Sequence, residues 1–265
     1  MIILITGITS GFGKAMAAQL AKDGHTVYGT HRHATTFLPG VHYIKAEVTL
    51  DADCEAAVRQ VIEAEGRLDV FISNAGMGIG GPLECCSLDD ARRQMDVNWM
   101  GMVRFLHFVL PVMRRQGSGK IICVSSIGGL MGLPFQGLYS ASKYAIEGYC
   151  EALRLELRGT GVTVTVLEPG DFATSFTASR SNVSAEEAHA AYPSYRAALD
   201  SIEHDETHGL KPEVLARKVS RIVRCRKPRY NYVIATFVQK LSILLKAILP
   251  KPLFAALLAW FYKMK

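Results

Sequence analysis

A tyrosine and a lysine stand four residues apart in the segment "YSASK", and a serine lies thirteen positions before the tyrosine; these are Tyr139, Lys143 and Ser126. On a helix, residues i and i+4 share one face, so the phenol and the ammonium group point the same way. A nearby ammonium favours the phenolate and is expected to lower the pKa of Tyr139 from its ordinary value of about 10. The three side chains therefore predict proton transfer to or from a substrate oxygen.

A glycine-rich turn follows the first apolar run of the chain. The run "IILIT" leads into "TGITSGFG" at residues 6–13, and the stretch "KAMAAQLAKDG" after it has helical character. Such a turn lets the backbone approach a pyrophosphate, which then lies at the positive end of the helix. We expect Gly7 to make the turn, Gly11 to allow the close approach and Gly13 to allow tight helix packing.

The end of the second predicted strand should contact the adenosine ribose of such a cofactor. At this place an acid binds a free 2′-hydroxyl, whereas an arginine accepts a 2′-phosphate. This chain has "THRH" at 30–33, with no carboxylate and with Arg32 in position. The pattern favours NADP(H) over NAD(H), while the plain alternative is that Arg32 is a solvated residue at a strand end.

The elements that must position these residues alternate along the chain. Short apolar runs, which predict strands, occur at 2–6, 26–30, 41–46, 69–73, 120–125, 162–168 and 230–235. Helix-length amphipathic segments lie near 13–23, 51–65, 91–116, 137–158 and 212–225. This alternation predicts an α/β fold with a doubly wound, mostly parallel, seven-stranded, Rossmann-like sheet. We expect a single catalytic domain over residues 1–235 and a C-terminal helical extension over 236–265.

One long interval interrupts the pattern. Residues 172–209 are predicted to be irregular, and an interval of this length is typical of a substrate loop or lid. Within it, "HDETH" has histidines at i and i+4 that could bind a metal, but the zinc-protease order needs a glutamate where Asp205 stands. We expect a polar lid helix ending at Gly209, and no metal site.

Further motifs complete a family pattern. "SNAG" at 73–76 follows the fourth strand, "DVNWMG" at 96–101 is expected to begin a long helix, and "EPGDFAT" at 168–174 ends the sixth strand. Together with the glycine turn and the spacing of Ser126, Tyr139 and Lys143, these segments resemble the short-chain dehydrogenase/reductase family over roughly residues 1–175.

The resemblance implies a role for each motif residue. Because adjacent strand residues face opposite sides, Ser125 and Ser126 cannot both serve, and the family spacing selects Ser126. Asn98 would hold a water in a proton relay, a role compatible with a buried polar group that stabilises a helix. Lys143 would hold the cofactor ribose. The implied NADP(H) site comprises Gly7, Thr9, Ser10, Gly11, Phe12, Gly13, Arg32, Glu47, Val48, Asn74, Ala75, Gly76, Tyr139, Lys143, Pro169, Gly170 and Thr174.

The implied reaction is hydride transfer between the nicotinamide and a ketone or aldehyde, with Tyr139 as general acid or base. The segment 129–153 further resembles the 17β-hydroxysteroid and retinol dehydrogenase branch, which implies a large apolar substrate in lipid or steroid metabolism. Four apolar residues near this site either form the substrate approach or merely pack in the core: Leu130, Met131, Leu133 and Phe135.

Two functions from other classes are alternatives. The chain could be a non-catalytic NADP-binding sensor or scaffold, although the intact set of Ser126, Tyr139, Lys143 and Asn98 argues against this. It could also be a nucleotide-sugar epimerase or dehydratase, but that class usually requires a longer C-terminal substrate domain.

Charge is distributed unevenly. The net charge is +6, but residues 210–265 contain 13 Lys and Arg and a single acid, Glu213, which gives this segment a net charge of +12. Its apolar runs, 236–249 and 253–262, are too short and too interrupted to span a bilayer. The tail is expected either to pack on the sheet edge or a neighbouring subunit, as in a homodimer or homotetramer, or to rest on an anionic membrane.

The N-terminal segment and the cysteines indicate the cellular compartment. The start "MIILIT" lacks the basic residues of a secretory signal, and six cysteines occur without a CxxC pair. We therefore expect a cytoplasmic protein with free thiols, with peripheral membrane contact as the second interpretation of the tail. An apolar small-molecule carbonyl or alcohol substrate is expected as its partner, and no nucleic acid.

Overall fold

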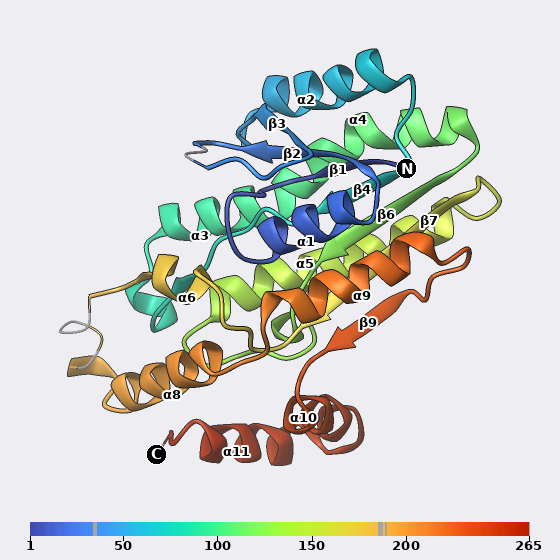
Figure 1. Ribbon diagram of the computed structural model, residues 1–265. Helices are drawn as coiled ribbons and strands as arrows, with labels where there is room; N and C mark the ends of the chain where they lie inside the picture. The colour runs from blue at the N-terminus through green and yellow to red at the C-terminus, as the bar shows by residue number, and fades with distance from the viewer. Residues whose placement is uncertain (34–35, 185–187, 189, 265) are drawn as a thin grey trace.

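The computed structural model describes residues 1–264 apart from 34–35, 185–187 and 189. Its central sheet has seven parallel strands in the order β3, β2, β1, β4, β6, β7, β9 (Figure 1). These strands are β1 (Ile2–Ile5), β2 (Thr26–His31), β3 (Val41–Lys45), β4 (Val70–Ser73), β6 (Gly119–Val124), β7 (Val162–Pro169) and β9 (Asn231–Ile234). The predicted α/β fold class, a doubly wound Rossmann-like sheet in a single domain, is confirmed.

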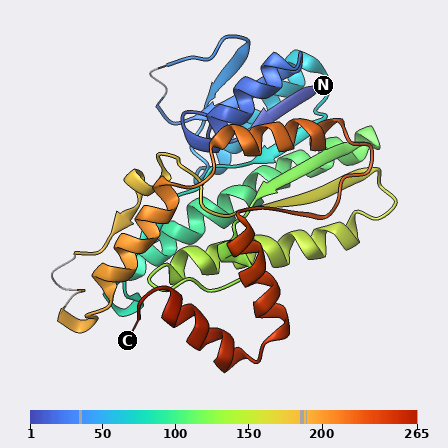
Figure 2. The same ribbon diagram turned by 60° about the horizontal axis from the view of Figure 1, so that its bottom comes forward.

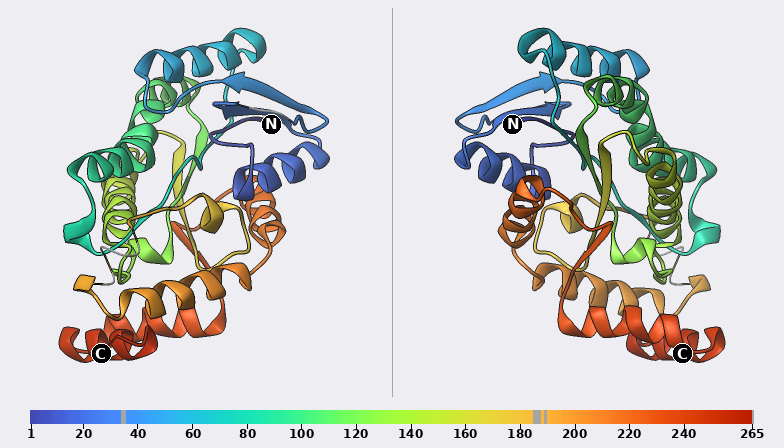
Figure 3. Two further views of the ribbon diagram at one scale, coloured as in Figure 1. Left: turned by 90° about the vertical axis from the view of Figure 1, so that its left-hand side faces the viewer. Right: turned by 90° about the vertical axis from the view of Figure 1, so that its right-hand side faces the viewer.

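Helices cover both faces of the sheet, so three layers are visible in Figure 3. This explains why the inner strands are continuous apolar runs rather than alternating ones; all four residues of β4 are buried. One face packs against α2 (Asp51–Glu65), α4 (Gly101–Gln116) and α5 (Gly137–Glu156). The opposite face packs against α1 (Gly11–Lys22) and α9 (Pro212–Arg224).

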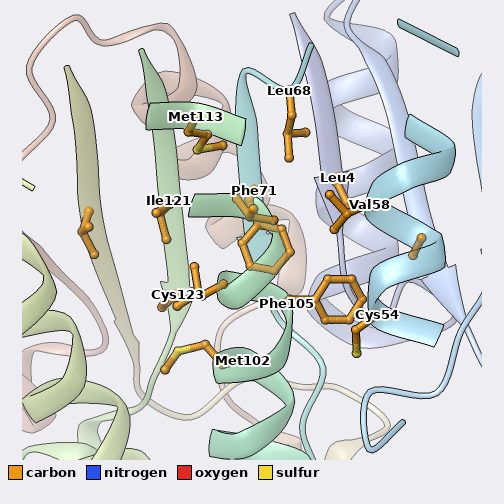
Figure 4. Packing of buried hydrophobic residues seen from close by; sticks show 14 of the residues in the cluster. Leu4, Cys54, Val58, Leu68, Phe71, Met102, Phe105, Met113, Ile121 and Cys123 are labelled. Carbon is orange, nitrogen blue, oxygen red and sulfur yellow. The ribbon is translucent and has the colours of Figure 1, made fainter. Parts of the chain in front are cut away.

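The core under α2, α4 and α5 contains aromatic and sulfur-bearing side chains (Figure 4). Phe71 of β4 stacks on Phe105 of α4 with ring centroids 5.5 Å apart. Cys54, Cys123 and Cys150 are fully buried in the same layer, and all six cysteines of the chain are free thiols. These thiols therefore act as small apolar groups in the core.

The long helix α4 begins within "DVNWMG", as predicted, and a shorter helix precedes that segment. This shorter helix is α3 (Leu88–Met95), which Ser87 caps by accepting a hydrogen bond of 3.0 Å from the Asp90 backbone N–H. A π-helical turn, Asp96–Met100, then joins α3 to α4. Such turns are often found at functional sites, and this one carries Asn98.

The interval 172–209 contains more regular structure than predicted. It includes α6 (Phe176–Ser179), β8 (Ser181–Asn182), which pairs with β5 (Ile79–Gly80), and α8 (Tyr195–Thr207). The expectation of an irregular segment is therefore wrong. The expected polar helix is instead amphipathic, with Leu199 and Ile202 buried, and it ends at Thr207 rather than at Gly209. Residues 185–187 and 189 of the interval lie outside the described residues.

The C-terminal extension forms two helices at one end of the molecule, α10 (Phe237–Ile248) and α11 (Lys251–Phe261) (Figure 2). Phe254 is buried against Ile127 and Met131, which belong to the loop after β6. In the described part of the chain, no helix is both long enough and apolar enough to cross a membrane.

The order of the strands positions the site. The chain runs from β1 outward to β2 and β3, then crosses back to β4 on the other side of β1. At this reversal the loops after β1 and β4 diverge and leave a crevice at the carboxyl edge of the sheet. The short 3-10 helix η3 (Ile127–Gly129) follows β6 at the same edge.

Candidate active site

The turn after β1 is made possible by glycines in the left-handed backbone region. Gly7 has φ +71° and Gly11 has φ +49°, a conformation that L side chains rarely adopt. The backbone N–H groups of Gly7 and Ile8 both donate to the Thr30 carbonyl at 3.1 Å. These bonds fix the turn over the start of α1, whose N-terminal N–H groups favour an anion.

Gly13 and Asn74 lock the turn from behind. A Cβ atom on Gly13 would lie 1.9 Å from the Gly7 carbonyl oxygen, so no other residue fits. The Asn74 side chain donates to the carbonyls of Thr6 and Gly7 at 2.9 Å each. Thr6, which the sequence did not single out, accepts bonds from the Asn74 and Ala75 backbone N–H groups. This network therefore ties the "SNAG" segment after β4 to the glycine turn after β1.

Arg32 and Glu47 face each other at the ends of β2 and β3. The Nε atom of Arg32 lies 3.7 Å from an Oε atom of Glu47, and the Arg32 side chain is 72% exposed. An ion pair this exposed contributes little to stability. The guanidinium is therefore accessible to a ligand phosphate, and both residues line the cavity described below.

The predicted catalytic side chains converge at the opposite side of the crevice. Tyr139 and Lys143 lie on consecutive turns of α5, and the Lys143 Nζ atom is 5.6 Å from the centre of the Tyr139 ring. Ser126 follows β6 and shares a side-chain hydrogen bond with Tyr139. Ser125, by contrast, donates to the Lys143 carbonyl at 3.4 Å. The contact with the phenol thus distinguishes Ser126 from its neighbour.

The expected lowering of the pKa of Tyr139 is wrong. Burial raises the pKa of the phenol to about 12, although the hydrogen bond from Ser126 acts in the opposite direction. Lys143 does not offset the burial, because its ammonium is directed to the Val124 carbonyl, 2.9 Å away. Burial also lowers the pKa of Lys143 to about 8. Both groups are therefore shifted toward their neutral forms.

Asn98 lies behind the cavity wall. Its Oδ1 accepts from the Met77 backbone N–H at 2.8 Å, and its Nδ2 donates to the Met77 carbonyl and to Ser142 Oγ at 3.0 Å each. The Ser142 hydroxyl in turn donates to the Tyr139 carbonyl at 2.7 Å. The side chain therefore ties the loop after β4 to the catalytic helix, and its predicted relay role remains a prediction.

One cavity of about 1140 Å³ collects almost all of the predicted residues. It is somewhat larger than a pocket for one drug-sized ligand, which leaves space for a dinucleotide and a substrate together. The predicted residues that line it are Gly7, Thr9, Ser10, Gly11, Phe12, Arg32, Glu47, Val48, Asn74, Ala75, Gly76, Ser126, Tyr139, Lys143, Pro169, Gly170 and Thr174. Gly13 and Asn98 instead support the wall from behind.

A group of acidic residues that was not predicted from the sequence lies at the far end of this cavity. Asp171, Asp205 and Glu206 line it, and burial followed by the charge of Glu206 raises the pKa of Asp171 to about 7. Glu206 pairs with buried Arg180 and accepts a bond of 2.7 Å from the Thr177 hydroxyl. Asp171 belongs to the motif "EPGDFAT", and Asp205 and Glu206 belong to "HDETH". Their place within these two motifs is the sequence feature that could have indicated them.

The C-terminal extension also reaches this cavity. Tyr262 lines its wall, and burial raises the pKa of that phenol above its ordinary range. Gln239 of α10 donates to a carboxylate oxygen of Asp171 at 2.5 Å. No local sequence pattern indicates these contacts, because they depend on how the extension folds back.

The expected apolar approach is only partly present. Leu133 lines the cavity. Met131 packs in a separate cluster with Ile127 and Phe254, and Phe135 packs on Tyr195 with ring centroids 5.0 Å apart. For Met131 and Phe135 the packing interpretation is therefore the correct one.

Comparisons with known proteins agree with this geometry. A family model described as "short chain dehydrogenase" matches residues 1–185. The 3-ketodihydrosphingosine reductase of Bacteroides thetaiotaomicron is 42% identical over 265 residues, which covers 100% of this chain and 98% of that protein. The 17-beta-hydroxysteroid dehydrogenase type 1 of Homo sapiens is 40% identical over 191 residues, which covers 66% of this chain and 58% of that protein.

A solved structure has the same fold. A short chain dehydrogenase/reductase from Burkholderia phymatum in complex with NAD superimposes with a TM-score of 0.80 at 23% identity, over 93% of this chain and 92% of that one. At this level of identity the likeness concerns the fold alone.

Proposed function

Because this chain belongs to the short-chain dehydrogenase family, we propose that it is an NADP(H)-dependent oxidoreductase that interconverts an apolar ketone or aldehyde and its alcohol. The observation that supports this proposal best is the meeting of Ser126, Tyr139 and Lys143 with the glycine turn in a single cavity. A binding protein without catalysis has no need for a proton donor at this place.

The nucleotide half of the cavity fits a nicotinamide dinucleotide. Gly7 and Gly11 leave backbone open at the N-terminus of α1, where a pyrophosphate would accept backbone N–H groups. Thr174, whose side chain lies beside Gly11, would bind the carboxamide end. When bound, the cofactor supplies or accepts the hydride.

Proton transfer falls to Tyr139. With its pKa raised to about 12, the phenol is protonated at neutral pH, and so it is prepared to give a proton to a developing alkoxide. Ser126 would donate a second hydrogen bond to the same oxygen and stabilise its growing charge. Lys143 has three N–H donors, of which one binds the Val124 carbonyl, so the others can hold ribose hydroxyls. These protonation states favour the reduction of a carbonyl.

Arg32 supports the choice of NADP(H). Its guanidinium is exposed and is only loosely paired with Glu47, so a 2′-phosphate could replace that pair with a charge-assisted contact. Glu47 is the nearest acid at this end and would repel a phosphate if Arg32 were absent.

For the substrate we propose a long-chain keto sphingoid base, the class named for the Bacteroides relative. Such a molecule carries an amine near its ketone, and Asp171, Asp205 and Glu206 line the cavity beyond Tyr139. The charges of Glu206 and Asp171 both act on the Tyr139 phenol, so these carboxylates are near the reacting position. A protonated amine there would relieve their mutual repulsion. Helices α6 and α8 would form the lid over this end.

The test is an assay of the purified full chain with NADPH or NADH and 3-ketodihydrosphingosine, with the alcohol measured by mass spectrometry. A long-chain ketone without the amine is the matched substrate. We expect faster turnover with NADPH and with the amino ketone, and loss of turnover in Tyr139→Phe. Absence of reduction of either ketone with both cofactors would refute the proposed activity.

A further inference from the structure

Helix α10 is amphipathic, but its polar face is directed to the protein and its apolar face is exposed. Its polar residues Gln239, Ser242 and Lys246 share one face and are directed to the protein: Gln239 binds Asp171, and Lys246 donates to the Leu130 carbonyl and the Tyr144 hydroxyl. The opposite face carries large apolar side chains that are exposed, with Phe237 at 79%. A helix on a water-soluble domain normally has the reverse arrangement.

Helix α11 also exposes large apolar side chains, although the face that it packs on the protein is apolar too. Phe254 is buried against the loop after β6, whereas Trp260 is 76% exposed. We define the tail face as the large exposed apolar side chains of both helices: Phe237, Val238, Leu241, Leu244, Ile248, Leu253, Leu257, Trp260 and Phe261. Apart from the adjacent pairs Phe237–Val238 and Trp260–Phe261, successive residues on each helix are three or four positions apart, so they form a stripe rather than scattered positions. A contiguous exposed apolar stripe marks an interaction surface.

The charged side chains of the extension itself are all positive. Lys240, Lys251 and Lys263 are exposed on or next to the two helices. No aspartate or glutamate occurs after Glu213 in the sequence. The surface is therefore apolar with a basic border, a combination that matches an anionic lipid bilayer.

We propose that the tail face rests on the surface of an anionic membrane, with Trp260 at the level of the headgroups. Helices of 12 and 11 residues are too short to span the hydrocarbon core, so the contact is interfacial. A second copy of this chain fits the face less well. A twofold interface would place the same lysines against each other, with no acid in the extension to pair with them.

This position would also orient the cavity. Helices α10 and α11 lie next to α8 at the same end of the molecule (Figures 1 and 3), and Tyr262 connects the extension to the cavity wall. If the proposed function holds, the substrate end would open close to the lipid in which an apolar ketone resides. Membrane binding itself does not depend on catalysis.

The experiment measures binding of the full chain, without cofactor or substrate, to vesicles of phosphatidylcholine alone or with phosphatidylglycerol. Co-sedimentation and tryptophan emission report binding. We expect binding only to the anionic vesicles, weakened by salt, with a blue shift that is lost in Trp260→Phe. Removing Lys240, Lys251 and Lys263 together by substitution with Gln should weaken binding roughly 100-fold, since each basic residue near such a surface contributes about fivefold.

A matched control distinguishes binding through the tail face from non-specific binding through any exposed apolar residue. Leu88 is 75% exposed on α3 and does not belong to the tail face, so Leu88→Ser should bind as the unmodified chain does. The double variant Phe237→Ser and Trp260→Ser should lose binding at least tenfold while keeping turnover of a water-soluble ketone. No binding to anionic vesicles at low salt would overturn the proposal. So would a double variant that binds normally, or one that converts an oligomer to monomers, since a second copy would then cover the face.

Discussion

The nucleotide half of the cavity is built around a glycine turn, whereas the substrate half is lined by several charged and aromatic residues. The first half is built from the turn after β1 and the loop after β4, which Thr6 and Asn74 tie together. The second half is built from α8, the loop after β7 and the C-terminal extension, which meet at Asp171, Glu206 and Tyr262. A wall built around a glycine turn can hold a constant cofactor, and a wall lined by side chains can be changed for another substrate without disturbing it.

The largest expected effect lies at the border between the halves. Tyr139→Phe removes the proton donor and keeps the ring, so turnover should fall by about 10²–10⁴-fold while cofactor affinity changes little. Steady-state assays and cofactor titration by fluorescence measure the two quantities. Equal loss of turnover and of cofactor affinity would show that the two halves are not separable at Tyr139.

Arg32→Ala tests the outer end of the nucleotide half. A charge-assisted contact to a phosphate contributes about 1.5–3 kcal/mol, so the dissociation constant for NADPH should rise by at least tenfold. The constant for NADH should change little, because NADH has no 2′-phosphate. Calorimetric titration with both cofactors measures the difference, and an equal loss for both would exclude a specific role for Arg32.

Gly13→Ala tests whether the glycine turn tolerates a single methyl group. The new Cβ would lie 1.9 Å from the Gly7 carbonyl oxygen, and overpacking of this kind costs about 1–3 kcal/mol of unfolding free energy. Cofactor binding should weaken with it, because the turn must move. Urea denaturation and cofactor titration give the two values.

Gly148→Ala is the matched control for that change. Gly148 lies inside α5, and a Cβ atom there meets nothing within 4 Å. Alanine should therefore raise the free energy of unfolding by about 0.5–1 kcal/mol. A loss of stability in both variants would mean that the contact at Gly7 is not the cause.

The smallest effect concerns the substrate half and its dependence on pH. Because the pKa of Asp171 is raised to about 7, its carboxyl stays protonated in the folded chain at pH values where it is ionised in the unfolded chain. Stability should therefore fall as pH rises from about 4 to 7, and Asp171→Asn should reduce this fall. Melting temperatures of both proteins over this range measure the difference. Glu147, whose pKa is also raised to about 7, titrates in both proteins and cancels in the comparison.

The same contrast explains what could be predicted from the sequence. The positions of Gly7, Gly11 and Gly13 and the i, i+4 pair of Tyr139 and Lys143 depend on local geometry, which spacing encodes directly. Asp171, Glu206 and Tyr262 come together only through the folding of distant segments, so no spacing indicated them. The prediction of a lowered pKa for Tyr139 was wrong for a related reason. The spacing places the Lys143 ammonium on the correct helix face, but burial raises the pKa of the phenol and the ammonium is directed to the Val124 carbonyl.

The alkylation rates of the buried thiols can measure how often one layer of the core opens. Cys54, Cys123 and Cys150 all lie in the core under α2, α4 and α5, while Cys225 after α9 is exposed. An alkylating reagent should therefore modify Cys225 within the native state, whereas the three core thiols should react only when that layer separates from the sheet. Because the opposite core contains no cysteine among its described residues, the rate of the slow reaction reports the opening of one face and not of the other.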